Sequence, residues 1–216
     1  MKLALVVPTY GPVDPAAAKH LRVAVMHAAQ HAEVQWVGDA SPDRVGFAAA
    51  RNMGAQAALA TDADAVMWVD SDIILPADGI SRLVHAGRDF ITGIYCQRAK
   101  PHWPLIAHFD DRRRVFNWWT HWPPNVIAPI DGCGFGCVLT SRTLLQAIPQ
   151  PWFTFEEFSE DFDFCLKAAH AGHQLYVDTG VVCEHLADPQ GVRLADFEGI
   201  RDGEGLDRYA QQSSAA

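Results

Sequence analysis

The chain has 216 residues, of which 49% are hydrophobic and 20% are charged. This length and composition are typical of a globular protein that buries one sizeable core, so we expect a single domain. The formal net charge of -9 at pH 7 disfavours wide contact with nucleic-acid phosphates, although the basic run Arg112 to Arg114 could still contact an anion. A small or neutral substrate is therefore favoured.

The cysteines and the apolar segments bear on location. Five cysteines make an odd number and include no CxxC pair, which argues against a disulfide framework and a structural zinc site. The apolar run from Met1 to Val7 stops at Pro8 and is too short for the core of a signal peptide, and no later run is long enough to span a membrane. We therefore expect a cytoplasmic protein whose first apolar run is a buried strand.

Short apolar runs alternate with alanine-rich stretches in the first half of the chain, which is typical of β-α units in a largely parallel sheet. In chain order, the pattern predicts strand 3–7, helix 16–32, strand 34–37, helix 45–61, strand 65–69, helix 78–86 and strand 90–95. Prolines, tryptophans and histidines between 101 and 129 predict strands and ordered loops. Helix 159–172 and short strands at 175–177 and 181–183 follow.

Two aspartates, Asp70 and Asp72, follow the apolar run 65–69 directly and are separated by Ser71. A strand that ends in paired acids offers a divalent cation two oxygen ligands at the carboxyl edge of a sheet, where open α/β folds bind their ligands. A solvated turn is the alternative, because an isolated D-x-D pair is common. The interpretation of the pair as a metal site therefore depends on the other candidate residues in the chain.

The candidate residues occur in an order that is more informative than any one of them. In chain order they are Pro8, Thr9 and Tyr10, then Asp39, Arg51 and Asn52, the acid pair, the glycine-rich loop 132–136, Glu160 and Asp161, and His185. With the blocks 68–72 (WVDSD) and 159–168 (SEDFDFCLKA), this order resembles the family 2 type of nucleotide-sugar-dependent glycosyltransferases, in particular small bacterial and phage members. The likeness covers roughly residues 3–186.

The resemblance implies an α/β protein with the GT-A fold, a Rossmann-like three-layer arrangement around a mostly parallel central sheet. The GT-A domain would cover 1–187, with the nucleotide-sugar half at about 1–95 and the acceptor half at about 96–187. The C-terminal tail, 188–216, would serve as a lid or a packing segment.

A metal site is expected from the acid pair and a distant histidine. The family pattern implies Asp72 as a direct ligand and Asp70 as a contact to the ribose or, through water, to the metal. His185 follows a predicted strand and would complete the site, although a packed histidine is the alternative. Imidazole beside carboxylate favours Mn²⁺ over Ca²⁺, and Mg²⁺ stays open.

The donor-binding residues implied by the resemblance are Pro8, Thr9, Tyr10, Asp39, Arg51, Asn52, Asp70 and Ser71. Asp39 could accept a hydrogen bond from the nucleotide base, or form an Asx turn with the residues that follow it. Arg51 could place its planar guanidinium on the diphosphate, or form a surface salt bridge. UDP is favoured as the nucleotide on family frequency alone.

An inverting transfer needs a base for the acceptor hydroxyl, and Asp161 best matches the family position for it. Glu160 is the alternative, and both acids also suit the N-terminus of a helix. If configuration is retained instead, Asp161 would only bind the acceptor. For the acceptor or the sugar, the candidates are Gly134, Phe135, Trp119 and Trp122, although tryptophan also fills cores.

The sequence thus favours a metal-dependent glycosyltransferase that moves a sugar from a nucleoside diphosphate to the hydroxyl of a saccharide or another acceptor. A non-catalytic nucleotide-sugar-binding module or an inactive subunit is the alternative. A sugar nucleotidyltransferase is disfavoured because residues 8–12 contain no Lys or Arg for a phosphate loop. A nucleic-acid acceptor is disfavoured by the net charge, and the sequence does not indicate an oligomeric state.

Overall fold

The computed structural model describes residues 1–9, 13–37 and 46–186. Two predicted donor contacts, Tyr10 and Asp39, lie outside these ranges, as does the predicted tail at 188–216. In the described part of the chain, no helix combines the length and the apolar character that crossing a membrane requires.

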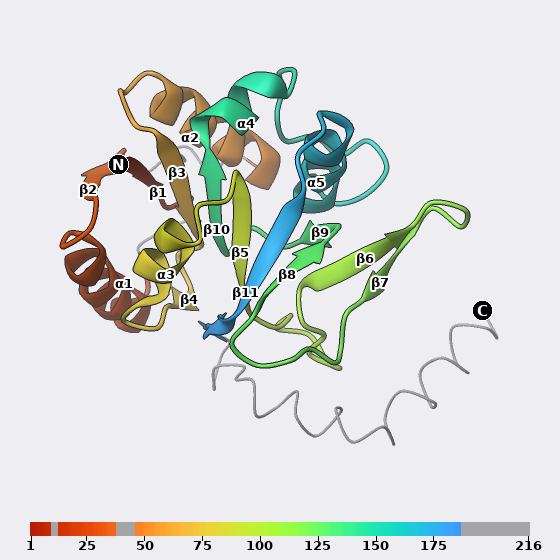
Figure 1. Cartoon of the computed structure of the whole chain (residues 1–216), viewed down its shortest axis with the longest axis horizontal. Helices are drawn as coiled ribbons and strands as arrows, with labels where there is room; N and C mark the ends of the chain where they lie inside the picture. Colours follow the sequence, from red (N-terminus) through yellow and green to blue (C-terminus); the bar gives the residue numbers. More distant parts are fainter. Residues whose placement is uncertain (10–12, 38–45, 187–216) are drawn as a thin grey trace.

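A seven-stranded sheet forms the centre of the molecule, in the order β2-β1-β3-β10-β5-β11-β8 (Figure 1). Its strands are β1 (Lys2–Val6), β2 (Glu33–Trp36), β3 (Ala65–Val69), β5 (Phe90–Ile94), β8 (Ile127–Ile130), β10 (Cys137–Ser141) and β11 (Leu175–Val182). Strands β10 and β8 run antiparallel to their neighbours, and the other five share one direction. The prediction of a mostly parallel central sheet is confirmed.

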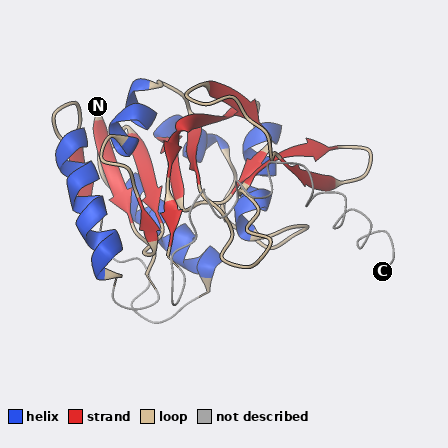
Figure 2. Ribbon diagram, turned by 90° about the horizontal axis from the view of Figure 1, so that it is seen from below, coloured by secondary structure: helices blue, strands red, loops and turns tan. Residues whose placement is uncertain are grey.

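Helices cover both faces of this sheet, which gives three layers (Figure 2). On one face lie α1 (Pro15–Ala28) and α3 (Gly79–His85), and on the other lie α2 (Phe47–Leu59), α4 (Arg142–Ala147) and α5 (Glu160–His170). Successive residues of a strand point to opposite faces, so Leu5 packs in the first core and Val6 in the second. Aromatic rings fill the second core, around Trp68.

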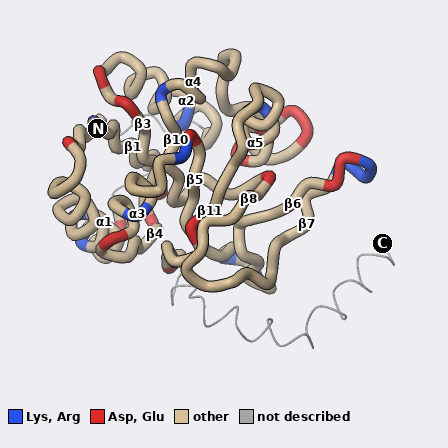
Figure 3. Tube along the Cα trace, in the orientation of Figure 1, with Lys and Arg blue, Asp and Glu red and all other residues tan. Residues whose placement is uncertain are grey.

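Two smaller sheets extend the central one. Strands β6 (Ile106–Asp110), β7 (Val115–Trp118) and β9 (Gly132–Cys133) pair in the order β7-β6-β9, and β4 (Ile73–Ile74) pairs with β12 (Glu184–His185). The β6–β7 ribbon projects from the body of the molecule (Figure 1), and charged residues gather at its tip (Figure 3). The stretch 101–129 is therefore strand and loop, as its prolines predict.

The predicted elements differ from the observed ones mainly at their ends. Helix α1 ends at Ala28 and not at residue 32, because bonds such as His31 N to the Ala28 carbonyl close a turn that leads into β2. The two short strands predicted at 175–177 and 181–183 are one strand, β11, which shifts register within its length. The polar residues in the middle of β11 suggest a break between two strands. Asp178 is nevertheless buried there, because its carboxylate forms a salt bridge with Arg82.

The glycines of the loop 132–136 make room for aromatic side chains of the protein itself. A Cβ atom on Gly136 would lie 2.7 Å from Cζ of Tyr95, and one on Gly134 would overlap the Tyr95 hydroxyl. A Cβ atom on Gly132 would lie 2.6 Å from the Phe116 ring. The backbone is therefore approached closely at these glycines, and the atoms that come close belong to Tyr95 and Phe116.

Replacing Gly136 by alanine should destabilise the fold. Its amide donates a 2.9 Å hydrogen bond to the Tyr95 hydroxyl in the core. The added methyl group must therefore push the Tyr95 ring away from the Gly136 backbone. We expect Gly136→Ala to lower the free energy of unfolding in urea by about 1–3 kcal/mol. Gly46→Ser is the control, because a Cβ atom there meets nothing within 4 Å and Ser is favoured at a helix N-cap. An equal loss in the control would contradict this account.

Candidate active site

The acid pair lies in a turn at the carboxyl end of β3, as predicted. The amide of Asp70 donates to the Gly136 carbonyl at 3.1 Å, and the amide of Ile73 donates to the Asp70 carbonyl at 3.1 Å, which closes the turn. The turn sends the two carboxylates to different partners. Asp70 contacts Arg51, whereas Asp72 contacts His185 and Arg98.

Arg51 lies in α2 and is only 4% exposed. Its Nη1 and Nη2 atoms donate to the Asp70 carboxylate at 3.1 and 3.4 Å. Its Nε atom lies 3.4 Å from Asp161 Oδ1 and 3.6 Å from Glu160 Oε1. The guanidinium also lies over the Phe135 ring, 5.5 Å from its centroid. The ion pairs of Arg51 are buried, which contradicts the alternative of a surface salt bridge, whereas its contact with a diphosphate stays a prediction.

Glu160 and Asp161 begin α5 and bring two more carboxylates to the Arg51 guanidinium that binds Asp70. Asp161 Oδ2 accepts a 3.3 Å hydrogen bond from the amide of Phe135. The pKa of Asp161 is raised to about 8, chiefly by burial and also by the negative charges of Glu160 and Asp70, against the opposing attraction of Arg51. A carboxyl group whose pKa lies close to neutral pH suits general acid–base work.

Asp72 and His185 come together although 112 positions of the chain separate them. Strand β12 pairs His185 with Ile73, next to Asp72, and His185 Nε2 lies 3.6 Å from Asp72 Oδ2. His185 Nδ1 donates a 2.7 Å hydrogen bond to the Cys96 carbonyl. Burial lowers the pKa of His185, and the charge of Arg98 lowers it further. The ring is therefore neutral near pH 7, with an Nε2 lone pair beside the Asp72 carboxylate.

These two residues fit a divalent cation in one specific respect. A histidine that ligates a metal commonly donates its other ring N–H to a backbone carbonyl, and His185 does so. Asp70 does not join them, since its carboxylate contacts Arg51. Within residues 1–9, 13–37 and 46–186, no group of three His, Cys, Asp or Glu side chains could hold a metal. A cation here would take Asp72 and His185 and leave its other positions to a ligand.

Arg98 is a site residue that the sequence pattern did not reveal. It follows β5, and its guanidinium forms an ion pair with Asp72 while its Nε atom donates to His185 Nε2 at 3.0 Å. A basic residue shortly after a strand that ends at the same sheet edge was the available signal. That signal is weak, because β5 joins the sheet beyond β10 and the order of the strands was not predicted.

The other predicted donor contacts have different surroundings. Thr9 is 5% exposed, and its hydroxyl finds no hydrogen-bond partner among the described residues. Asn52 uses its side-chain amide on the backbone of Phe153, donating to its carbonyl at 2.8 Å and accepting from its amide at 3.0 Å. Pro8 and Ser71 are half-buried. Asn52 therefore fixes the chain before α5 and does not present its amide to a nucleotide.

Burial contradicts the prediction that Phe135 and Trp122 contact the acceptor or the sugar. Phe135 is completely buried among core rings, and Trp122 is only 5% exposed. Tyr95 fills the space beside Gly134. Trp119 is half-buried, with its ring centroid 5.2 Å from that of His108. Of these four candidates, only the Trp119 side chain keeps a partly exposed surface with which to contact a sugar.

Solved structures place the fold. The chain is similar to A197 from STIV, with a TM-score of 0.62 and 18% sequence identity over 87% of each chain. It is also similar to GalNAc-T7 solved with UDP, GalNAc and Mn²⁺, with a TM-score of 0.54 and 12% identity. This second match covers 86% of this chain and 44% of the other. The chain has a GT-A glycosyltransferase fold.

The sequence comparisons add nothing to the structural ones. No protein-family model matches the chain, and no curated protein sequence matches it. At 18% and 12% identity, the similarity to solved structures shows the GT-A fold alone. The roles of individual residues therefore rest on the geometry described above.

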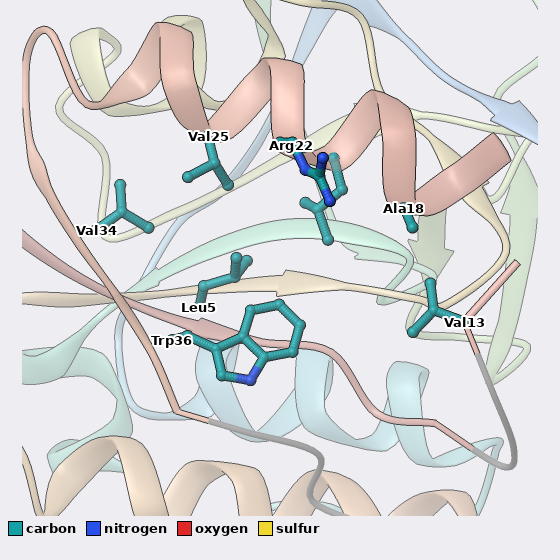
Figure 4. A pocket seen from close by; sticks show the side chains of 8 residues that line it. Leu5, Val13, Ala18, Arg22, Val25, Val34 and Trp36 are labelled. Atoms are coloured by element: carbon teal, nitrogen blue, oxygen red, sulfur yellow. The ribbon is translucent and has the colours of Figure 1, made fainter. Parts of the chain in front are cut away.

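A pocket of about 290 Å³ lies elsewhere in the GT-A fold, between α1 and the strands β1 and β2 (Figure 4). It is lined by Leu5, Val13, Ala18, Leu21, Arg22, Val25, Val34 and Trp36. The lining is apolar apart from Arg22, and it includes none of the residues predicted for the site. The chemistry-bearing side chains therefore lie outside this pocket.

Loss of the buried guanidinium should weaken the whole fold. Arg51→Met leaves Asp70, Glu160 and Asp161 without their shared cation, and breaking a buried ion pair in this way costs about 3–5 kcal/mol of unfolding free energy. Urea denaturation followed by circular dichroism measures the change. Arg113→Met is the matched control, because that side chain is 82% exposed, and its unfolding midpoint should not move. A wild-type midpoint for Arg51→Met would contradict the role given to Arg51.

Proposed function

We propose that the protein is a metal-dependent glycosyltransferase. It transfers a sugar from a nucleoside diphosphate donor, with UDP favoured, to a hydroxyl group of a saccharide or another acceptor. The transfer inverts the anomeric configuration, and Asp161 is the base. The donor-binding residues are Thr9 and Ser71, the metal ligands are Asp72 and His185, and Asp70 fixes the turn that carries Ser71 and Asp72.

One observation carries the proposal. Within a GT-A fold, Asp70, Asp72, Asp161 and His185 converge from β3, α5 and β12 on one edge of the central sheet. Carboxyl edges of this kind are where open α/β sheets bind ligands. GalNAc-T7, which has a similar fold, was solved with UDP, GalNAc and Mn²⁺, and this supports UDP and Mn²⁺ as the first ligands to test.

Asp72 and His185 would hold the cation, because one offers a carboxylate and the other an imidazole lone pair directed at the same place. A divalent ion supplies Lewis-acid stabilisation of the diphosphate leaving group when bound. Thr9 contributes a buried hydroxyl that has no partner among the described residues and is free to bind the donor. Asp70 stays with Arg51, so its contribution is to fix the turn that presents Asp72.

Asp161 takes the proton of the acceptor hydroxyl as that oxygen attacks the sugar. Only the carboxylate form can accept this proton, and the pKa of Asp161 is raised to about 8 by burial. The groups that face it are Arg51, Glu160 and Asp70, and of these only Arg51 favours the charged form. The fraction of active base therefore rises as the pH rises through this pKa.

The first test is a donor panel. The purified protein is incubated with UDP-, GDP- and dTDP-sugars in Mn²⁺ or EDTA, and released nucleoside diphosphate is measured together with thermal shift. We expect release from one donor, and loss of that release in EDTA. Asp72→Ala should abolish metal-dependent turnover, whereas Asp111→Ala, at the exposed tip of the β6–β7 ribbon, removes the same charge and should leave it unchanged.

The outcomes of this panel separate the candidate functions. Turnover that is unaffected by Asp72→Ala would remove the metal role of Asp72. Stabilisation by a donor without any turnover would favour a nucleotide-sugar-binding module. No response to any donor would overturn the proposed function.

Asp161→Asn tests the base. The amide cannot accept the proton, so we expect donor binding to survive while transfer falls by on the order of 10²-fold or more. In the wild type, kcat should rise with pH through an apparent pKa of about 8, and this rise should be absent from the residual activity of the variant. Wild-type rates with an unchanged pH profile would move the base to Glu160 or favour retention of configuration.

A further inference from the structure

The guanidinium of Arg98 contacts the same two atoms that would ligate a divalent cation, Asp72 Oδ2 and His185 Nε2. It forms an ion pair with Asp72 Oδ2, and its Nε atom donates to His185 Nε2 at 3.0 Å. Asp72 Oδ2 and His185 Nε2 also lie only 3.6 Å from each other. Metal and guanidinium therefore require the same carboxylate oxygen and the same nitrogen lone pair.

The tautomer of His185 means that Arg98 and a metal cannot bind its ring at the same time. The Cys96 carbonyl can only accept a hydrogen bond, so His185 Nδ1 must carry the proton that it donates at 2.7 Å. Nε2 then has one lone pair, which accepts from Arg98. One lone pair cannot accept an N–H and ligate a metal at the same time.

The exposures show which of the groups can move. The Arg98 side chain is 55% exposed, whereas those of Asp72 and His185 are 21% and 12% exposed. The guanidinium therefore reaches the pair from the solvent side and can leave without repacking the core. The backbone beside it is fixed, because Gln97 donates to the Trp103 carbonyl at 2.8 Å and Cys96 pairs with Pro104.

We propose that Arg98 is an exchangeable internal cation: it holds Asp72 and His185 together when no divalent metal is bound, and it must leave them before a metal can bind. The proposal rests on the proposed function, because it takes Asp72 and His185 as the metal ligands. Arg98 is a positioning residue, and by competing for the same two ligand atoms it lowers the affinity of the metal-free protein for a divalent cation. Removing its side chain should therefore tighten metal binding and not weaken it.

The experiment measures binding of Mn²⁺ to the full-length protein after treatment with a chelator and in the absence of nucleotide. Free Mn²⁺ is followed by electron paramagnetic resonance during a titration with MnCl₂. We expect Arg98→Gln to lower the Kd for Mn²⁺ by about tenfold, since a competing charge-assisted contact is lost. Arg98→Lys keeps the charge without the planar fork and should fall between the two. His185→Ala in the Arg98→Gln background should abolish the tight binding.

The controls separate competition from a general effect of charge. Arg113→Gln removes the same charge at an 82% exposed position, and its Kd for Mn²⁺ should match the wild type. Circular dichroism establishes that each variant is folded, and Arg98→Lys carries the comparison if Arg98→Gln is not. Equal or weaker Mn²⁺ binding by the Arg98 variants, or equal tightening by Arg113→Gln, would overturn the proposal.

The donor panel run beside this titration distinguishes the two failures. Mn²⁺-dependent turnover by the wild type, with no tightening in the Arg98 variants, would overturn the role of Arg98 and leave the proposed function standing. No binding of Mn²⁺ by any variant, together with no response to any donor, would overturn both. Turnover that persists in EDTA, with no Mn²⁺ binding, would overturn the role of Arg98 and the metal dependence while keeping sugar transfer.

Discussion

The buried guanidinium of Arg51 is the contact on which the site depends. It binds Asp70 at the end of β3 and lies beside Glu160 and Asp161 at the start of α5. Three carboxylates that are largely withdrawn from water cannot share one place without a cation, because the cost of desolvating their charges would exceed the stabilisation from packing. Arg51 thereby fixes the first half of the chain against the second, and by engaging Asp70 it leaves Asp72 as the carboxylate of the acid pair that we propose as a metal ligand.

The two arginines of the site have opposite physical characters. Arg51 is 4% exposed and is surrounded by carboxylates and aromatic rings, so its contacts persist as long as the fold does. Arg98 is 55% exposed, and solvent can replace its contacts with Asp72 and His185 at small cost. Arg51 is thus a permanent partner of the turn 70–72 and Arg98 is an exchangeable one, as we expect of the proposed site, which must bind and release an anionic donor.

The sequence predicted the fold better than the pairing of its side chains. Strand β3 was placed at its observed bounds, because five apolar residues followed by acids mark a buried strand and its end. Periodicity does not reveal which distant segments meet, so it indicates neither the partners of Arg51 nor the contacts of Arg98 with Asp72 and His185. The aromatic core shows the same limit: Phe135 and Trp122 suit a sugar platform by residue type, yet both are buried in the second core.

The most direct test of this account is the position of a bound metal. Crystals grown with UDP and MnCl₂ would locate manganese by its anomalous scattering. We expect a single peak between Asp72 and His185, with Arg98 turned away from both and Arg51 still bound to Asp70. A peak at any other group of residues, or UDP bound away from the carboxyl edge of β3, would contradict it.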